Sequence, residues 1–485
     1  MRALAHAFRS AAGAFPLAAG ALLLAAGAFV PLMSAAAPER YPVDWLKLEP
    51  EILANFTALL KIDTSNPPGN ETAAANAIKA VLEREGIPCK LFALDAARAN
   101  LVARIRGSGA RKPILIMGHT DVVGVQREKW TFDPFAAINR NGVIYARGAR
   151  DDKPHVVAGM MILLLLKRMN VKLDRDVIFL AEAGEEGTST YGIDYMVKEH
   201  WAEIDAEFAL AEGGSIVEQG GKAHHVLIST TEKSPQRMRL VAHGPAGHAS
   251  RPEMGNAVVH LAEAVARAGN WQTPMRLNET TRVYFQRLAE ISPPALAARY
   301  RDILNPQRAA EADRYFRKNE AGHYSILRTS VVPTIVNIGF RSNVIPSEGE
   351  ATLDVRALPD EDMTKFVAEL RRAIDDPAIE VIPPKTNARP VSPPSRIDTE
   401  MFRVFEEVGQ RMFHVPTLPD MMTGATDNAQ LRAKGVQAYG TGPIVTPEEG
   451  PLGGAHTDDE HIPVRSLMAM MEYLWNSVVG VAAAN

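Results

Sequence analysis

Apolar positions in the first half of the chain alternate between strand-like and helix-like spacing. Residues 114–117, 177–181 and 208–211 are short, almost wholly apolar runs, which are typical of strands buried on both faces of a sheet. Between and after these runs, residues 156–169 and 191–201 repeat apolar positions at helical spacing. This alternation predicts an α/β fold with a mixed, mostly parallel sheet covered by helices.

The middle of the chain carries a different pattern. Two helix-like runs, at residues 257–268 and 362–374, are interleaved with strand-like runs at residues 238–242, 334–339, 351–356 and 379–382. The resulting strand-helix-strand-strand-helix-strand order predicts a small α+β layer. Within this part, residues 275–330 are polar and predicted to be helical.

From residue 399 the α/β pattern returns and ends in an amphipathic helix at residues 464–479. We therefore expect one discontinuous α/β domain, formed by residues 38–232 and 390–485. A smaller α+β domain, residues 233–389, is expected to be inserted into it.

The N-terminal segment has the features of a signal peptide. Arg2 and Arg9 precede an apolar stretch at residues 11–30, and small residues follow at 34–37. Cleavage of residues 1–36 predicts a secreted or periplasmic protein with no stable membrane insertion. The alternative is an uncleaved N-terminal membrane anchor, because residues 11–32 are nearly long enough to span a bilayer.

Composition and charge narrow the chemistry. The 485 residues carry a net charge of −4, which gives no basic footprint for nucleic acid, so we expect no nucleic-acid partner. Cys89 is the single cysteine, and this excludes both an intrachain disulfide and a thiolate-based zinc site. Any metal ion must therefore be held by histidine, aspartate and glutamate.

Acidic and imidazole side chains recur where predicted strands end or the chain turns. They are His119, Asp121, Asp151, Glu185, Glu186, Glu212 and His456. In isolation each has an ordinary interpretation, as a helix cap, a polar turn, an acidic loop or a surface histidine. However, a parallel sheet brings the carboxyl ends of its strands to one edge. Carboxylates and imidazoles together suit a pair of divalent ions, with Zn²⁺ the best fit.

Several motifs resemble one known family. They are Gly-His-Thr-Asp-Val-Val at 118–123, the block at 142–153, Glu-Glu-Gly at 185–187, Gly-Pro-Ala-Gly-His-Ala-Ser at 244–250, Asn-Val-Ile-Pro at 343–346 and Asp-Val-Arg at 354–356. This order resembles the aminoacylase/carnosinase/glutamate carboxypeptidase family of co-catalytic zinc metallopeptidases. It is most similar to the carboxypeptidase S and N-acyl amino acid hydrolase branch. The resemblance runs from about residue 50 to the C-terminus.

The resemblance implies a zinc-peptidase-type catalytic domain with two Zn²⁺ ions per subunit, although other divalent ions remain possible. His119 and Glu186 would bind one ion, and Asp151 would bridge both. Glu212 and His456 would bind the other ion.

The resemblance also implies roles in catalysis and substrate binding. Glu185 would be the general base, and Asp121 would orient His119. His248, from this chain or a neighbouring subunit, would stabilise the oxyanion. Arg356 and Asn343 would bind a substrate carboxylate. The structural alternatives are a loop histidine at 248, an Arg356–Asp354 ion pair and a turn residue at 343.

Together, these observations predict an exported dinuclear zinc hydrolase that cleaves an amide bond next to a free carboxylate. Short peptides would be the substrates, as in carboxypeptidases and dipeptidases. An N-acyl amino acid deacylase of the aminoacylase type is the first alternative. A non-catalytic binding protein that kept the fold is the second. The resemblance also implies a lid and a homodimer, both formed through the inserted domain.

Overall fold

The computed structural model describes residues 40–384, 389–446 and 454–484. The predicted signal peptide, residues 1–36, lies outside the described residues, so cleavage and export stay predictions. Within the described ranges, every helix is too short or too polar to cross a membrane.

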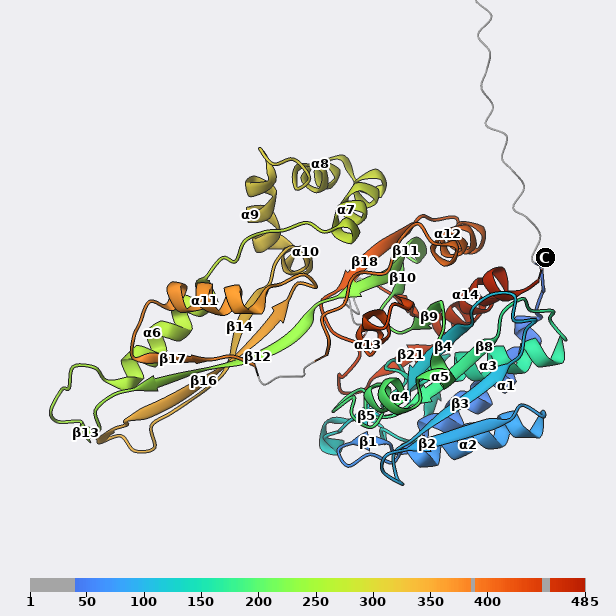
Figure 1. Ribbon diagram of the computed structural model, residues 1–485, viewed down its shortest axis with the longest axis horizontal. Helices are drawn as coiled ribbons and strands as arrows, with labels where there is room; N and C mark the ends of the chain where they lie inside the picture. The colour runs from blue at the N-terminus through green and yellow to red at the C-terminus, as the bar shows by residue number, and fades with distance from the viewer. Residues whose placement is uncertain (1–39, 385–388, 447–453, 485) are drawn as a thin grey trace, which may run out of the picture. The chain divides into compact units, whose positions relative to one another are not determined.

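A large mixed sheet organises most of the described chain (Figure 1). In spatial order it contains β2 (Cys89–Ala93), β3 (Ala99–Ile105), β8 (Val177–Glu182), β4 (Ile114–His119), β9 (Phe208–Ala211), β19 (Gln437–Gly440), β11 (Lys222–Glu232), β10 (Ser215–Gln219) and β20 (Ile444–Val445). A further strand, β18 (Thr417–Met422), pairs with β11. The central strands β8, β4, β9 and β19 run parallel, whereas pairs such as β2–β3 and β10–β11 are antiparallel. The predicted α/β fold with a mixed, mostly parallel sheet is confirmed.

Both faces of this sheet are covered by helices, which explains the apolar strand sequences. In β4, Ile114 and Ile116 pack on one face, whereas Leu115 and Met117 pack on the other. The first face is covered by α1 (Trp45–Leu60), α2 (Glu71–Arg84), α3 (Lys153–Arg168), α12 (Glu400–Phe413) and α14 (Val464–Ala482). The second face is covered by α4 (Ile193–Glu199), α5 (Trp201–Ile204) and α13 (Asn428–Ala433). Every position of the strand is therefore buried, as a doubly covered sheet requires.

A second, antiparallel sheet lies in the middle of the chain. Its order is β14 (Ser330–Ile338), β16 (Glu348–Ala357), β12 (Ser234–His243) and β17 (Ile379–Ile382). Helices α6 (Ala257–Asn270) and α11 (Met363–Ile374) pack on it around a separate apolar core. A small pair, β13 (Gly247–His248) and β15 (Val344–Ile345), lies near its end in Figure 1. The predicted α+β element order is present, while the domain borders at 38, 232/233, 389/390 and 485 stay predictions.

Residues 275–330 form helices, as predicted: α7 (Glu279–Ile291), α8 (Pro294–Asp302), α9 (Ala309–Asn319) and α10 (Ala321–Ile326). They enclose an aromatic core in which the rings of Phe285 and Phe316 stack with centroids 5.6 Å apart. The same core includes Leu418 and Met421 of β18. This helical segment therefore packs against the large sheet, although in sequence it interrupts the smaller one.

Candidate metal centre and active site

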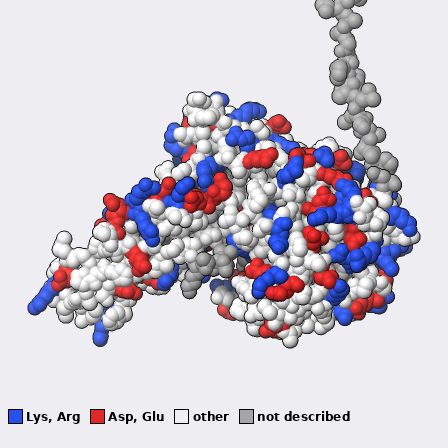
Figure 2. Space-filling model, viewed as in Figure 1, with Lys and Arg blue, Asp and Glu red and all other residues white. Residues whose placement is uncertain are grey.

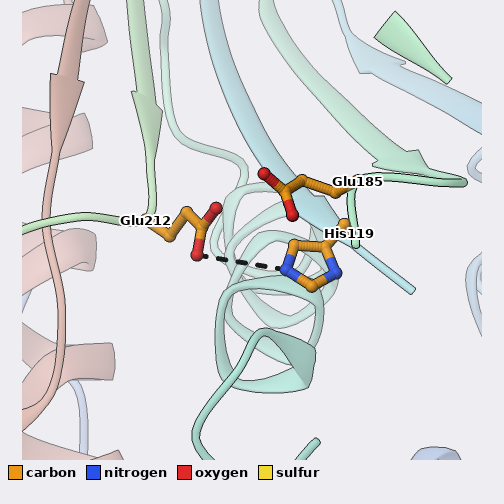
Figure 3. A group of neighbouring side chains, drawn as sticks. All are labelled: His119, Glu185 and Glu212. Atoms are coloured by element: carbon orange, nitrogen blue, oxygen red, sulfur yellow. Dashed lines mark ion pairs between the residues drawn. The ribbon is translucent and has the colours of Figure 1, made fainter. Parts of the chain in front are cut away.

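Three neighbouring parallel strands bring candidate side chains to one edge of the large sheet. His119 is the last residue of β4, Glu185 follows β8 after a short turn, and Glu212 directly follows β9. Because β8, β4 and β9 are adjacent and parallel, their carboxyl ends meet. Figure 3 shows the three side chains converging, with the Glu212 carboxylate directed at the His119 ring. The expected convergence is present.

Asp151 lies between two imidazoles. It comes just before α3, where the chain enters the helix. Its Oδ1 lies 3.0 Å from His119 Nε2, and its Oδ2 lies 3.2 Å from His456 Nε2. Each carboxylate oxygen therefore faces a different histidine, which is the arrangement expected of a carboxylate that bridges two ions.

The remaining carboxylates divide between the two histidines. His456 Nε2 lies 2.9 Å from Glu186 Oε1, and His119 Nε2 lies 3.9 Å from Glu212 Oε2. These contacts pair His119 with Glu212 and His456 with Glu186. The motif resemblance instead assigns Glu186 to the ion of His119, and Glu212 to the ion of His456. Ligand atoms of His119, Asp151 and Glu186 do lie within 4.8 Å of one another, as that assignment requires. The five expected ligands thus lie in one cluster. Their shortest contacts favour one ion held by His119 and Glu212 and a second ion held by His456 and Glu186.

The donor set fits a pair of small divalent ions. In a tetrahedral site with bonds of 2.0–2.2 Å, two ligand atoms are about 3.3–3.6 Å apart. The contacts of 2.9–3.9 Å among these side chains bracket that separation. Nitrogen and oxygen donors without thiolate are compatible with Zn²⁺ and with harder divalent ions.

The electrostatics also favour bound cations. Burial, and then the charge of Asp151, raise the pKa of Glu212 well above its usual range. Burial would also raise the pKa of Asp151, but hydrogen bonds with His119 and His456 more than offset it and lower that pKa. The hydrogen bonds of His456 to Asp151 and Glu186 raise its pKa to about 10. The carboxylates thus concentrate negative charge at the site. Bound protons neutralise part of this charge here, and bound metal ions would neutralise it in their place.

Glu185 has the environment of a general base. Burial raises the pKa of its carboxyl to about 8, against the lowering effect of the nearby Arg389. One of its carboxylate oxygens lies within 4.8 Å of a ring nitrogen of His119 and of a carboxylate oxygen of Glu212. A carboxylate with a raised pKa beside the cluster is suited to accept a proton near neutral pH.

Asp121 contacts two segments of the cluster. His119 Nδ1 lies 2.9 Å from the Asp121 carbonyl oxygen and 3.5 Å from its Oδ1. The Asp121 carboxylate accepts the backbone N–H groups of Glu185 and Glu186, each at 3.1 Å. Asp121 is therefore placed both to orient His119, as expected, and to fix the Glu185–Glu186 turn.

Glu460 holds the Asp151 loop in place, a role that the sequence did not reveal. Its Oε1 accepts the backbone N–H groups of Arg150 and Asp151 at 2.7 and 3.2 Å, and its Oε2 lies 2.5 Å from Arg147 Nη1. Glu460 is fully buried and only four residues after His456. It therefore joins the segments that carry two of the metal ligands. Because Glu460 is 310 residues from Arg150 in the sequence, local spacing could not identify this contact.

Replacing Glu460 by Ala should destabilise the fold. The variant leaves the buried Arg147 guanidinium without its counter-ion, and breaking a buried pair in this way costs about 3–5 kcal/mol. Chemical denaturation should show this loss in the free energy of unfolding. As a control, Asp459→Asn removes an exposed contact with Thr131 and should change stability by less than about 1 kcal/mol. Equal stability of both variants would contradict the assignment.

Arg389 is a second residue that the sequence did not single out. Its guanidinium forms ion pairs with the carboxylates of Glu185 and Asp427, the latter at 2.9 Å. It lies in an irregular, proline-containing segment, so no periodic pattern marks it. Asp427 is itself buried.

The other expected site residues have their polar contacts outside the cluster. Exposed His248 has Nδ1 3.1 Å from Ser250 N and 2.8 Å from Ser250 Oγ. The carbonyl of exposed Asn343 accepts the N–H of Ala249. Arg356 forms the two-point pair with Asp354 that was the structural alternative, at 2.8 and 3.2 Å. Among the described residues, the hydrogen bonds and ion pairs found for these three side chains involve no member of the cluster, and their catalytic roles stay predictions.

Known proteins are similar to this chain in sequence and in fold. The model of peptidase family M20/M25/M40 matches residues 115–478. Human N-fatty-acyl-amino acid synthase/hydrolase PM20D1 is 27% identical over 387 residues, covering 77% of this chain and 75% of the relative. Human aminoacylase-1 is 27% identical over 398 residues, covering 80% and 86%.

Solved structures support the same fold. The M20 family metallo-carboxypeptidase Sso-CP2 from Sulfolobus solfataricus superposes with a TM-score of 0.67 at 20% identity, over 88% of this chain and 98% of that one. The family model covers well over half of the sequence. This chain, with its strand-edge cluster of imidazoles and carboxylates, therefore belongs to peptidase family M20/M25/M40.

Proposed function

We propose that this hydrolase uses two zinc ions to cleave an amide bond next to a free carboxylate in short peptides. The observation that carries the proposal is the placement of Asp151, whose two oxygens face His119 and His456. Glu212 and Glu186 lie beside these histidines, and Glu185 lies beside the cluster. Such an arrangement serves amide hydrolysis by an activated water molecule.

The side chains divide the work of the reaction. His119 with Glu212 and His456 with Glu186 would each hold one ion, with Asp151 shared. Bound there, the two ions would supply Lewis-acid activation of water and of the scissile carbonyl. Glu185 accepts the proton of the attacking water and then donates it to the leaving amine. Asp121 keeps both the His119 ring and the Glu185 backbone in place during this transfer.

Deacylation of N-acyl amino acids is the second candidate. The names of two relatives, N-fatty-acyl-amino acid synthase/hydrolase and aminoacylase-1, support it. Both candidate reactions break an amide bond whose nitrogen belongs to an amino acid with a free carboxylate. The cluster serves either reaction. The two candidates differ only in the acyl group of the amide bond, which is an aminoacyl group in a dipeptide and another acyl group in an N-acyl amino acid.

A substrate panel tests the proposal. Dipeptides, N-acyl amino acids and the C-terminal amides of both would be incubated with the zinc-loaded protein and analysed by mass spectrometry. We expect dipeptides with a free carboxylate to be cleaved fastest, activity to disappear on chelation, and Zn²⁺ to restore it. Faster cleavage of N-acyl amino acids would instead establish the deacylase. Absence of any metal-dependent cleavage would reject both and favour a binding protein.

We also propose export through the N-terminal segment. Arg2, Arg9 and the apolar stretch of residues 11–30 support it. Expression in a bacterium, followed by N-terminal sequencing of the periplasmic fraction, should find a chain that begins near residue 37. A membrane-bound chain that retains Arg2 would establish the anchor instead.

We further propose a homodimer formed through the second sheet. Among the described strands, β14 forms one of the two edges of this sheet and pairs only with β16, so its other side can pair with a further strand. It exposes Val332, Ile335 and Val336 by 51–52%. The end of the sheet around β13 is also mostly uncharged in Figure 2. A second copy would cover this apolar edge and would supply His248 of the partner subunit to the cluster.

Ile335→Lys should weaken this dimer. A charge at the centre of an apolar edge is costly to bury, so the molar mass measured by light scattering should fall from two chains to one. As a matched control, Leu94→Lys changes a residue of similar exposure that lies outside the second sheet and should leave the mass unchanged. A wild-type protein that is monomeric at micromolar concentration would contradict the proposal.

A further inference from the structure

A buried aspartate–histidine pair adjoins the bridging carboxylate. Asp152 follows Asp151 in the sequence, and its Oδ1 lies 2.5 Å from His155 Nδ1. The two residues are three positions apart at the start of α3, so the helical turn places them on the same face. They are only 1% and 2% exposed. The other Asp152 oxygen, Oδ2, has no hydrogen-bond partner among the described residues, so the orientation of this carboxylate depends on His155.

The opposite side of the His155 ring reaches the segment that carries Glu212. His155 Nε2 lies 3.2 Å from the hydroxyl oxygen of Thr441, which is also buried. The backbone N–H and the hydroxyl of Thr441 both donate to the Ala211 carbonyl, at 2.7 and 3.2 Å. The Thr441 carbonyl accepts the N–H of Gly214 at 3.1 Å. Thr441 therefore holds the chain on both sides of Glu212, and His155 is attached to it.

The aspartate–histidine pair also packs against the strand that carries His119. A Cβ atom on Gly118 would lie 2.9 Å from His155 Cβ and 3.1 Å from Asp152 Oδ2, which is closer than ordinary van der Waals contact. Only a glycine therefore leaves room for the pair beside the end of β4. We refer to Asp152, His155 and Thr441 as the supporting network.

The supporting network adjoins one of the two proposed ion sites. It contains or contacts residues next to Asp151, Glu212 and His119, the three side chains assigned to one ion. Among the described residues, the hydrogen bonds and ion pairs found for the network involve neither His456 nor Glu186, which belong to the other ion. A support that reaches the ligands of one ion should affect the binding of that ion selectively.

We propose that His155 is a positioning residue that sets the distance between the Asp151 and Glu212 carboxylates. This inference rests on the proposed two-ion site. The imidazole contacts Asp152 through one nitrogen and Thr441 through the other, so it joins the two segments that supply these carboxylates. An ion needs both carboxylates within bonding distance at the same time, so loss of the connection lowers its affinity. From its buried position, His155 acts only through these segments.

Release of zinc from the full-length protein tests the inference. The zinc-loaded chain would be titrated with a competing chelator as wild type, Thr441→Val, Thr441→Ser and His155→Phe. Thr441→Val keeps the shape of the side chain but loses the hydroxyl, so the affinity for one of the two ions should fall about 10- to 100-fold. Thr441→Ser keeps the hydroxyl and should restore most of this affinity. His155→Phe should weaken the same ion, and adding Thr441→Val to it should cause little further loss.

A diffraction experiment identifies the weakened ion. Crystals of Thr441→Val with one zinc per chain should show the anomalous peak beside His456 and Glu186. As a matched control, Thr273→Val removes a similarly buried hydroxyl, which donates to the Thr329 carbonyl, and should release both ions as wild type does.

The outcomes separate this inference from the proposed function. Unchanged affinities, equal weakening of both ions, or loss of the ion beside His456 would overturn the role of His155. If His155→Phe does not fold, the comparison of Thr441→Val with Thr441→Ser still decides. A wild-type protein that holds two zinc ions but cleaves no peptide would overturn the proposed function, whereas the zinc affinities would still decide the role of His155.

Discussion

Replacing Glu185 by Gln should lower kcat by about 10²–10⁴-fold, the contribution of a positioned general base. Gln has nearly the same shape, but its amide cannot accept the proton of the attacking water. The five expected metal ligands are untouched, so zinc content should stay at the wild-type value. Steady-state kinetics together with metal analysis of the purified variant would measure both quantities.

The control for this variant is Glu199→Gln, which removes an exposed carboxylate at the end of α4. It should leave both kcat and zinc content unchanged. If Glu185→Gln retained full turnover, another group would have to be the base. If it lost zinc, Glu185, which lies within 4.8 Å of ligand atoms of His119 and Glu212, would be a metal ligand and not the base.

Asp151→Asn should have the second large effect. The variant keeps the size of the side chain but replaces one carboxylate oxygen by an NH2 group, which cannot bind a cation, so the side chain can no longer bridge two ions. We expect the zinc content to fall from two ions per chain to one or fewer. Activity should fall about 10³-fold or more, since a catalytic metal ion contributes several kcal/mol to stabilising the transition state. Calorimetric zinc titration and steady-state kinetics would measure both.

Asp133→Asn is a suitable comparison for Asp151→Asn, because Asp133 is an exposed acid that pairs with Arg127 outside the cluster. It should bind two ions and retain activity. Two tightly bound ions in Asp151→Asn would show that this carboxylate does not bridge them, and the proposed arrangement would then be wrong.

The convergence of the site residues could be predicted because it depends on a few strands whose sequences are wholly apolar. Residues 114–117, 177–181 and 208–211 are apolar on every position, so their burial in one sheet is nearly unavoidable. Once these strands are parallel neighbours, the residues that follow them must meet at one edge. His119, Glu185 and Glu212 therefore came together in the structure for the reason given by the sequence.

Other strands of the same sheet could not be predicted. β11 and β18 contain polar residues and, in β18, a proline, so neither shows a clear apolar pattern. Their partners are far away in the chain, with Val226 opposite Thr417 and Leu227 opposite Leu418. The sequence consequently predicts none of the elements β18, α13, β19 and β20. Long-range pairing, rather than local propensity, decides these segments.

The division of the ligands and the supporting residues also depended on tertiary contacts. Strand order places His119 near both Glu186 and Glu212, and only side-chain distances distinguish the two pairings. Arg389 and Glu460 are single charged residues in irregular segments, and they act on groups 204 and 310 residues away. Spacing along the chain carries no information about such contacts.

The central claim is that Asp151 joins two metal ions held by His119 and His456. The most direct measurement is anomalous diffraction at the zinc absorption edge from crystals of the zinc-loaded protein. We predict two anomalous peaks about 3.5–4 Å apart, each about 2.0–2.2 Å from one of these histidines and from one oxygen of Asp151. A single peak, or peaks that do not share Asp151, would contradict the account.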